Sequence, residues 1–270
     1  MDNKTEIRKT ALITGATMGI GYELTKLFAK DSYNLVLVAR NKDKLYEIKE
    51  KFNKKYNVDI LVIVKDLSVP NAAIEIFNET IEKQIVIDVL VNNAGIGHFG
   101  KFHNEDLSKI SDILQINIVS LTQLTRLFVE GMVKRKEGKI LNVSSMAAFQ
   151  PGPYMAVYYA SKAFVQSFSE AITNELKGTG VTVTTLCPGP TRTGFQKEVG
   201  SEGSKLSKLK MLSSPKKVAE DGYNALQAGK EVEIPGMLNA SLIKTSNVIP
   251  RKTKIQIVSK LQEFNRSNLN

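Results

Sequence analysis

Short apolar runs alternate with helical patterns along most of this chain, and this alternation restricts the fold more than any other feature. Between the runs, apolar residues recur at the three- and four-residue spacing of amphipathic helices. Strands that alternate with helices form right-handed βαβ units, so their sheet is mainly parallel and is covered on both faces. We therefore expect an α/β fold with a doubly wound sheet of about seven strands. The predicted strands are 10–14, 34–39, 60–64, 86–91, 139–143, 181–186 and 231–234.

The chain has 270 residues and contains no linker, internal repeat or low-complexity tract, so we expect a single domain over 1–270. Its one cysteine, Cys187, excludes an internal disulfide framework and a cysteine-based zinc site. The two histidines add no metal constellation, so no metal is expected. The polar start and the lack of a run of about 20 apolar residues predict a cytoplasmic protein.

The net charge of +10 is concentrated in two segments, 196–217 and 251–270. The first holds six lysines against two glutamates, and the second holds five basic residues against one glutamate. Such patches can attract an anionic substrate, a carrier protein or an acidic lipid surface, although solvated surface lysine is the simpler explanation. No aromatic interleaving or reader motif accompanies the charge, so a nucleic-acid partner is not expected.

A glycine-rich turn, TGATMGIG at 14–21, follows the first strand. Glycines there allow a tight turn and let a pyrophosphate approach backbone N–H groups at the start of a helix. The spacing is G-x-x-x-G-x-G, which differs from the G-x-G-x-x-G fingerprint, and no Gly-Lys-Ser/Thr of a triphosphate loop follows. Close packing is an alternative, but the place of this turn after the first strand predicts a Rossmann-type dinucleotide site.

The end of the second strand indicates which dinucleotide is bound. An NAD-binding unit usually presents an acidic residue about twenty positions beyond the glycines, whereas this chain has Ala39 and Arg40. An arginine can pair with a 2′-phosphate through two hydrogen bonds, so NADP(H) is favoured over NAD(H); the alternative is a solvated arginine. Asp66, after the third strand, could accept from the adenine amino group or cap the following helix.

Tyr158 and Lys162 stand four residues apart in a predicted helix, so their side chains share a face. A lysine ammonium at that position favours the phenolate, so we expect it to lower the tyrosine pKa from about 10. With the Ser145 hydroxyl from the preceding strand, this group could hold a carbonyl oxygen while a hydride reaches its carbon. Tyr159 points about 100° away from Tyr158 and is expected to pack. Ser144 lies on the opposite face of its strand from Ser145.

These motifs together resemble the short-chain dehydrogenase/reductase family over about residues 8 to 195. TGATMGIG resembles that family's cofactor turn, NNAG its fourth-strand motif, Ser145 with YYASK its active site, and CPGPTRT its turn after the sixth strand. The resemblance implies that Tyr158 is the general acid/base and that Ser145 orients the substrate carbonyl. It also implies that Lys162 binds the nicotinamide ribose and lowers the tyrosine pKa. Asn117, in LQINIVSLTQ, would hold a water in a proton relay.

The same resemblance implies a set of cofactor-binding residues along the strand ends. NADP-dependent members often carry a basic residue inside the glycine turn, and none is present here, so the NADP(H) prediction rests on Arg40 alone. The implied cofactor-binding residues are Gly15, Thr17, Met18, Gly19, Ile20, Gly21, Arg40, Asp66, Leu67, Asn93, Ala94, Gly95, Tyr158, Lys162, Pro188, Gly189, Thr191 and Thr193.

Beyond residue 195 the family diverges. The segment near 190–217 is expected to be a lid that closes over the substrate, with a plain surface loop as the alternative. The C-terminal extension 235–270 resembles a broad bacterial group of reductases and, more distantly, long-chain 3-oxoacyl-CoA and hydroxysteroid reductases. We expect it to pack within the chain or against another subunit rather than on a membrane surface. The family implies a homodimer or homotetramer that packs through helices around 105–130 and 158–176.

The sequence thus predicts an NADP(H)-dependent oxidoreductase that transfers hydride between the nicotinamide and a small carbonyl or alcohol substrate of acyl or hydrophobic character. One alternative is an NADP(H)-binding regulatory or scaffold protein without turnover, since a fold alone does not give a function. Another is isomerisation or dehydration with a tightly retained cofactor. The sequence fixes neither the substrate, nor its stereochemistry, nor the direction of the reaction.

Overall fold

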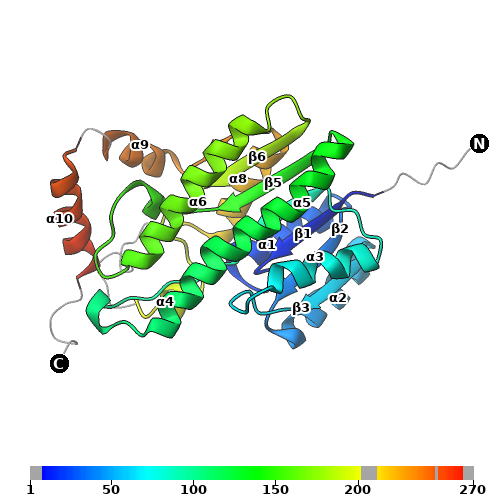
Figure 1. Cartoon of the computed structure of the whole chain (residues 1–270), viewed down its shortest axis with the longest axis horizontal. Coiled ribbons are helices and arrows are strands. Elements are labelled where there is room, and N and C mark those ends of the chain that lie inside the picture. The colour runs from blue at the N-terminus through cyan, green and yellow to red at the C-terminus, as the bar shows by residue number, and fades with distance from the viewer. Residues whose placement is uncertain (1–7, 202–211, 247–248, 264–270) are drawn as a thin grey trace, which may run out of the picture.

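The computed structural model describes residues 8–201, 212–246 and 249–263, and these form one seven-stranded sheet with helices around it (Figure 1). The strands lie in the order β3-β2-β1-β4-β5-β6-β7, and every pairing between neighbours is parallel. The predicted doubly wound sheet is therefore confirmed. The strands are β1 (Thr10–Thr14), β2 (Asn34–Ala39), β3 (Ile60–Val64), β4 (Val89–Asn92), β5 (Gly138–Val143), β6 (Val181–Leu186) and β7 (Val232–Glu233).

Strand β4 begins three residues later than the apolar run at 86–91 suggests. Val86 is exposed in the connection that precedes the strand. Contact with β1 starts at Asp88, which donates its backbone N–H to Thr10 O at 2.9 Å and accepts from Thr10 N through Oδ2 at 2.8 Å. Apolar character alone does not mark where a strand starts, because apolar residues also occur in the connection.

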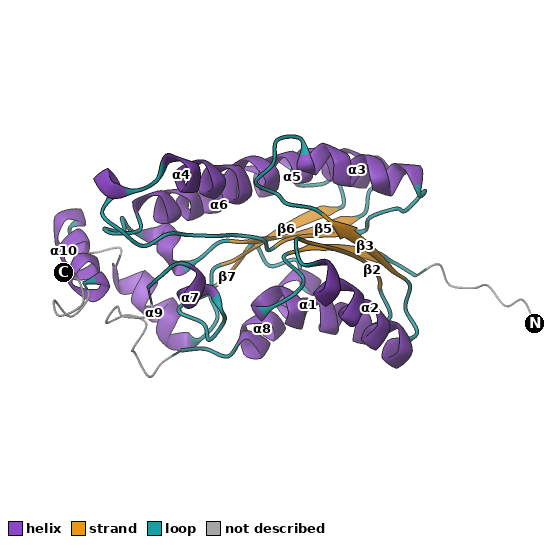
Figure 2. Ribbon diagram, turned by 90° about the horizontal axis from the view of Figure 1, so that it is seen from below, coloured by secondary structure: helices purple, strands orange, loops and turns teal. Residues whose placement is uncertain are grey.

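Helices cover both faces of the sheet (Figure 2). One face carries α1, α2 and α8, and the other carries α3, α4, α5 and α6. The short helix α7 and the C-terminal helices α9 and α10 lie beyond the sheet, at the end where the strands finish. The helices are α1 (Gly19–Lys30), α2 (Lys42–Tyr56), α3 (Ala72–Glu82), α4 (Leu107–Leu114), α5 (Leu121–Arg135), α6 (Ala156–Glu175), α7 (Phe195–Glu198), α8 (Pro215–Gln227), α9 (Met237–Ser246) and α10 (Arg251–Gln262).

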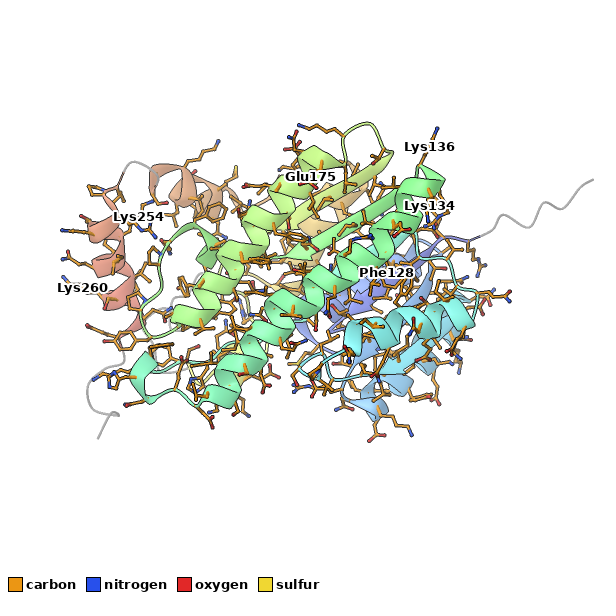
Figure 3. The ribbon with its side chains drawn as sticks, viewed as in Figure 1. Phe128, Lys134, Lys136, Glu175, Lys254 and Lys260 are labelled. Atoms are coloured by element: carbon orange, nitrogen blue, oxygen red, sulfur yellow. The ribbon has the colours of Figure 1, made fainter. Side chains whose placement is uncertain are left out.

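Each face of the sheet has its own hydrophobic core with an aromatic pair between two helices. Phe28 of α1 meets Tyr223 of α8 edge to face, with ring centroids 4.9 Å apart. On the other face, Phe77 of α3 meets Phe128 of α5 at 5.2 Å, and Phe128 is labelled in Figure 3. Full burial of one such side chain stabilises the fold by about 1.5–3 kcal/mol. The two cores fix the helices that frame the carboxyl ends of the strands.

The C-terminal helix α10 packs onto the body of the same chain. Lys260, labelled in Figure 3, lies on its outer side, whereas Val258 and Gln262 are buried. This helix therefore packs within the chain through its buried side chains, while residues 264–270 lie outside the described part. No described helix is both long and apolar enough to cross a bilayer. Val258 belongs to a small apolar cluster with Ala147, Met155, Tyr159 and Val199.

The turn between α6 and β6 predicts a matched pair of glycine variants. Gly178 and Gly180 both have left-handed backbones, with φ of 81° and 84°. A Cβ on Gly180 would lie 1.9 Å from Lys136 O, but a Cβ on Gly178 would have no heavy atom within 4 Å. We expect Gly178→Ala to lower the free energy of unfolding by about 1 kcal/mol, from the backbone conformation alone. Gly180→Ala should cost roughly 2 kcal/mol more, because the backbone must also move.

Urea denaturation of the two variants and the parent chain gives both free energies. Equal losses for the two alanine variants would show that the close approach to Lys136 O carries no energetic weight.

Candidate active site

The glycine turn follows β1 and leads directly into α1. Gly15 and Gly19 adopt left-handed backbones, with φ of 65° and 56°. Helix α1 begins at Gly19, so the free N–H groups of its first turn lie at the carboxyl end of β1, where they favour an anionic group. A Cβ on Gly21 would lie 2.2 Å from Gly15 O and 2.4 Å from Asn93 Nδ2. Gly21 is thus needed for close packing behind the turn.

Side chains join the ends of β1 and β4. Asn93 donates through Nδ2 to Thr14 O at 2.9 Å and to Gly15 O at 3.2 Å. Thr14 Oγ1 accepts from the backbone N–H groups of Asn93 and Ala94, both at 3.0 Å, and donates to Val91 O at 3.2 Å. Strand order reverses between β1 and β4, which is where doubly wound sheets bind ligands. The Asn93 amide therefore builds this crevice.

A cavity of about 590 Å³ lies over the crevice, within the size range of ligand sites. All of the predicted cofactor-binding residues except Gly21 line this cavity. Six further residues line the cavity that no sequence motif indicated: Val38, Asn41, Lys65, Ile96, Ile116 and Pro190. The predicted residues on the wall are Gly15, Thr17, Met18, Gly19, Ile20, Arg40, Asp66, Leu67, Asn93, Ala94, Gly95, Tyr158, Lys162, Pro188, Gly189, Thr191 and Thr193.

Arg40 and Asp66 meet at the end of the cavity beyond β2 and β3. Arg40 is largely exposed, and its Nη1 lies 4.0 Å from Asp66 Oδ2. Asp66 accepts through Oδ1 from the backbone N–H and the hydroxyl of Ser68, each at 2.9 Å. It therefore closes a local turn, and the expectation that it caps the next helix is wrong, because Asn71 occupies the N-cap position of α3.

Lys65 is a second cation at this end, and no sequence motif predicted its place there. It stands at the carboxyl end of β3, lines the cavity and forms an ion pair with Glu75 of α3. Arg40, by contrast, has its guanidinium largely in solvent. Strand order could have revealed Lys65, because β2 and β3 are neighbours in parallel register, with Ala39 opposite Val64.

Strand β5 and helix α6 position the predicted catalytic side chains. Ser145 caps the 3₁₀ helix η3 (Met146–Phe149) by accepting from Ala147 N at 3.1 Å, and its hydroxyl acts on the Tyr158 phenol by lowering the pKa of that group. Ser144 instead is buried and donates to Lys162 O at 2.8 Å. The two serines therefore differ as strand alternation predicts, and Ser145 is the one on the same side as Tyr158.

Burial shifts the pKa values of Tyr158 and Lys162 in opposite directions. It raises the pKa of Tyr158 above its usual value, against a smaller lowering by the hydrogen bond from Ser145. Burial also lowers the pKa of Lys162 to about 8. For the protein without a cofactor, the expectation that Lys162 lowers the Tyr158 pKa is therefore wrong. Lys162 Nζ lies 5.8 Å from the centre of the Tyr158 ring and donates to Val143 O at 2.9 Å.

Asn117 lies in the π-helical turn η2 (Gln115–Ser120) between α4 and α5, a geometry frequent at functional sites. It donates through Nδ2 to Ile96 O and to Ser161 Oγ, both at 2.9 Å, and accepts from Ile96 N at 3.0 Å. Its side chain is not on the cavity wall. A Cβ on Gly95 would lie 3.1 Å from Lys162 Nζ and 3.4 Å from Asn117 Oδ1. Asn117 thus holds the loop after β4 close beside Lys162.

The part of the cavity beyond Tyr158, which we call the substrate end, is built from η3, α6, α7 and α10. Tyr159 is buried and packs in an apolar cluster as expected, and it also lines this end of the cavity and accepts a hydrogen bond from Gln262 Nε2 at 2.9 Å. Gln262 is 103 residues away in the sequence, and no local pattern indicates the contact. The other lining residues at this end are Met146, Ala147, Gln150, Met155, Phe195, Gln196, Glu198 and Ser201.

The predicted lid at 190–217 includes residues 202–211, which lie outside the described part of the chain. Both ends of the segment are joined to each other. Thr191 and Ser213 form a parallel β-bridge, Arg192 N donates to Ser213 O at 2.9 Å, and Ser213 N donates to Pro190 O at 3.0 Å. Helix α7, just after this bridge, contributes to the substrate end of the cavity.

A sequence model of the family described as short chain dehydrogenase matches residues 9–203. The chain belongs to this family. It is 37% identical over 182 residues to the very-long-chain 3-oxoacyl-CoA reductase of Rattus norvegicus, a match that covers 66% of this chain and 58% of that relative. It is 33% identical over 224 residues to the ketoacyl reductase HetN of a Nostoc species, covering 81% and 75% of the two chains.

A solved structure agrees with the fold. The short-chain dehydrogenase from Sphingobium yanoikuyae in complex with NADPH superposes with a TM-score of 0.78 at 26% sequence identity. The match covers 90% of this chain and 97% of that one. Helix α10 lies beyond the residues that the family model matches, so the substrate end combines family elements with a part of the chain outside them.

The buried Lys162 predicts how stability depends on pH. Its pKa is about 8 in the folded protein against 10.5 for a free side chain, so between these values the unfolded chain binds more protons. The contribution of Lys162 to the free energy of unfolding therefore rises with pH in this window. We expect Lys162→Met to raise the free energy of unfolding at pH 7 by about 2 kcal/mol, and this gain to shrink toward pH 10.

Urea denaturation of the cofactor-free protein at several pH values measures the difference. Lys134→Met, at a largely exposed position of α5, is the matched control. A gain from Lys162→Met that stays constant between pH 7 and pH 10 would show that Lys162 titrates like a free lysine.

Proposed function

We propose that this chain is an NADP(H)-dependent reductase that transfers hydride to the ketone of a 3-oxoacyl thioester, giving the corresponding alcohol. The observation that carries the proposal is the convergence of Ser145, Tyr158 and Lys162 on one cavity at the switch point of the sheet. A regulatory protein that only binds cofactor would not need this set, and a scaffold would not need the substrate end.

Tyr158 is the proton donor in this proposal. Its raised pKa keeps the phenol protonated at neutral pH, which suits reduction, where a proton must pass to the carbonyl oxygen. The Ser145 hydroxyl, which lines the same cavity as the phenol, offers a second donor to the same oxygen as negative charge develops there. The nicotinamide, when bound, supplies the hydride.

Lys162 has two roles in this proposal: it binds the cofactor ribose and stabilises the deprotonated form of the proton donor. With a pKa of about 8 it is mostly charged at pH 7, and one of its hydrogens is used by Val143 O. Because Gly95 has no side chain, Nζ is open on the cavity side, where its remaining hydrogens can hold the ribose hydroxyls of the cofactor. Its positive charge stabilises the phenolate that forms when Tyr158 gives up its proton.

The adenine end of the cavity supports NADP(H) rather than NAD(H). The residues directly after β2 are Arg40 and Asn41 rather than a carboxylate, and Arg40 and Lys65 bring two cations to the ends of β2 and β3. A 2′-phosphate carries negative charge that these cations attract, and an arginine can bind it through two hydrogen bonds. The solved relative from Sphingobium yanoikuyae, which contains NADPH, supports the same choice.

The proposed substrate class rests on the names of the relatives and on the side chains that line the cavity. The relatives from Rattus norvegicus and Nostoc are named as 3-oxoacyl-CoA and ketoacyl reductases. Because the match covers only 58% of the rat protein, its substrate is transferred to this chain as part of the proposal. The apolar side chains of Met146, Met155 and Phe195 line the substrate end and suit an acyl chain.

The proton-donor role predicts the effect of Tyr158→Phe. Loss of the hydroxyl should lower kcat for NADPH-dependent reduction of an acetoacetyl thioester by roughly a thousandfold. NADPH affinity, measured by fluorescence titration, should stay within about twofold, because the cofactor wall is otherwise unchanged. Tyr154→Phe makes the same change at a position off the cavity wall and should leave kcat near the parent value.

Unaltered turnover in Tyr158→Phe would reject the assigned acid. NADPH binding by the parent chain without oxidation by any carbonyl would favour the regulatory alternative.

The cofactor assignment predicts the effect of Arg40→Asp. A carboxylate at this place repels the 2′-phosphate and can accept from the 2′-hydroxyl of NADH. We expect the ratio of kcat/KM for NADPH to that for NADH to fall by roughly a hundredfold, because the pair between the arginine and the 2′-phosphate is lost and the new carboxylate repels that phosphate. Arg126→Asp makes the same change of charge on the exposed face of α5 and should leave the ratio unchanged. An unchanged ratio in Arg40→Asp would mean that the 2′-phosphate is held elsewhere.

A further inference from the structure

Gln262 reaches the substrate end of the cavity from the last described turn of α10. Its side chain is 1% exposed and belongs to the cavity wall. Nε2 donates to the Tyr159 hydroxyl at 2.9 Å and lies 3.7 Å from Met155 Sδ. Tyr159 follows Tyr158 on α6, and their rings meet edge to face with centroids 6.0 Å apart. The hydrogen bond thus places a buried amide close to the proposed proton donor.

The Gln262 amide has unused hydrogen-bonding capacity. Among the described residues its hydrogen bonds run through Nε2 alone, so Oε1 has no partner there. Because the Tyr159 hydroxyl can both donate and accept, the amide can turn to offer the cavity either its oxygen or its NH₂ group. A bound molecule can therefore complete the pair whether it offers a donor or an acceptor.

The charges around this amide favour a neutral group. The cations on the described cavity wall are Arg40 and Lys65 beyond β2 and β3, and Lys162 beside Tyr158. The substrate end holds instead amide and hydroxyl groups and one carboxylate, that of Glu198. A carboxylate of the substrate would lose its hydration there without gaining a cation from the described wall, which costs several kcal/mol. An ester, thioester, amide or hydroxyl group avoids this cost.

We propose that Gln262 and Tyr159 form a subsite that hydrogen-bonds a second, neutral polar group of the ketone substrate. The subsite makes the enzyme prefer ketones with such a group, for example 3-oxo esters and thioesters, to simple ketones of the same size. This inference rests on the proposed reductase function and adds a specificity-determining residue from outside the part of the chain that the family model matches. Gln262 acts on binding, while proton transfer stays with Tyr158.

The test compares ethyl 3-oxohexanoate with nonan-4-one, which have equal chain lengths and the same ketone position and differ in the ester group. The measured quantity is the ratio of their kcat/KM values with NADPH, in the parent chain and in Gln262→Leu. Leucine keeps most of the volume but removes the amide. We expect the preference for the ester to fall roughly tenfold, mainly through KM, as for one lost hydrogen bond. The different intrinsic reactivity of the two ketones cancels, because each variant is compared with the parent.

A binding measurement separates the subsite from the chemistry. In the Tyr158→Phe background with NADPH present, calorimetry should show that Gln262→Leu weakens binding of the ester about tenfold and leaves that of nonan-4-one nearly unchanged. If the parent chain turns over neither ketone but this difference in binding appears, the reductase function fails while the subsite stands. If the ester does not bind, or if Gln262→Leu weakens both ketones equally, the subsite is overturned.

Two further variants control for the packing of α10. Val258→Ala loosens the same helix at a buried position off the cavity wall and should leave the ester preference unchanged. Tyr159→Phe removes the partner hydroxyl and should lower the preference without disturbing the helix. Because the two residues act as one unit, the double variant should lose no more preference than Gln262→Leu alone. Additive losses in the double variant, or an equal effect from Val258→Ala, would contradict the proposal.

Discussion

The hydrogen bonds between Thr14 and the residues that follow β4 fix the geometry on which the rest of the site depends. They hold the ends of β1 and β4 together at the place where strand order reverses, so the crevice is set by protein atoms alone. The glycine turn must then pass close to the Asn93 amide, which leaves no room for a side chain at Gly15 or Gly21. Gly95, two residues beyond Asn93, is thereby brought beside Lys162 on α6. The hydrogen bonds between these two strand ends thus set the distance from the glycine turn to the predicted acid–base pair, Tyr158 and Lys162.

Burial gives the acid–base pair its resting state. Taking Tyr158 and Lys162 out of water favours the neutral form of each, so the pKa of the phenol rises and that of the ammonium falls. The Lys162 ammonium is kept in place by Val143 O at the end of β5, and the main chain of α6 at Lys162 is held by Ser144. Strand β5 therefore fixes both ends of the lysine. In the proposed reaction, a site arranged in this way would hold its proton on the tyrosine until a carbonyl oxygen arrives to take it, which is the state that reduction needs.

The sequence predicted the parts of this structure that depend on local pattern. The strands, the glycine turn and the pair of Tyr158 and Lys162 all follow from the period of apolar residues or from helical spacing, and most strand boundaries agree with the structure. Contacts between distant segments were missed. The bond from Gln262 to Tyr159 spans 103 residues, and the place of Lys65 depends on the order of strands in the sheet. The direction of the Tyr158 pKa shift was also wrong, because burial is a property of the whole fold and outweighs the charge of one neighbour.

The bridge between Thr191 and Ser213 brings the chain back to the point from which it left the sheet. On one side lie the predicted cofactor-binding residues after β6, and on the other Ser214 caps α8 by accepting from Lys217 N at 3.1 Å. Because the closing entropy of a loop grows only by about 0.6 kcal/mol for each doubling of its length, insertions and deletions between these anchors leave the sheet almost untouched. The stretch between these anchors can therefore change in length and sequence during evolution. Such changes can alter the range of substrates while the residues proposed for hydride transfer keep their positions.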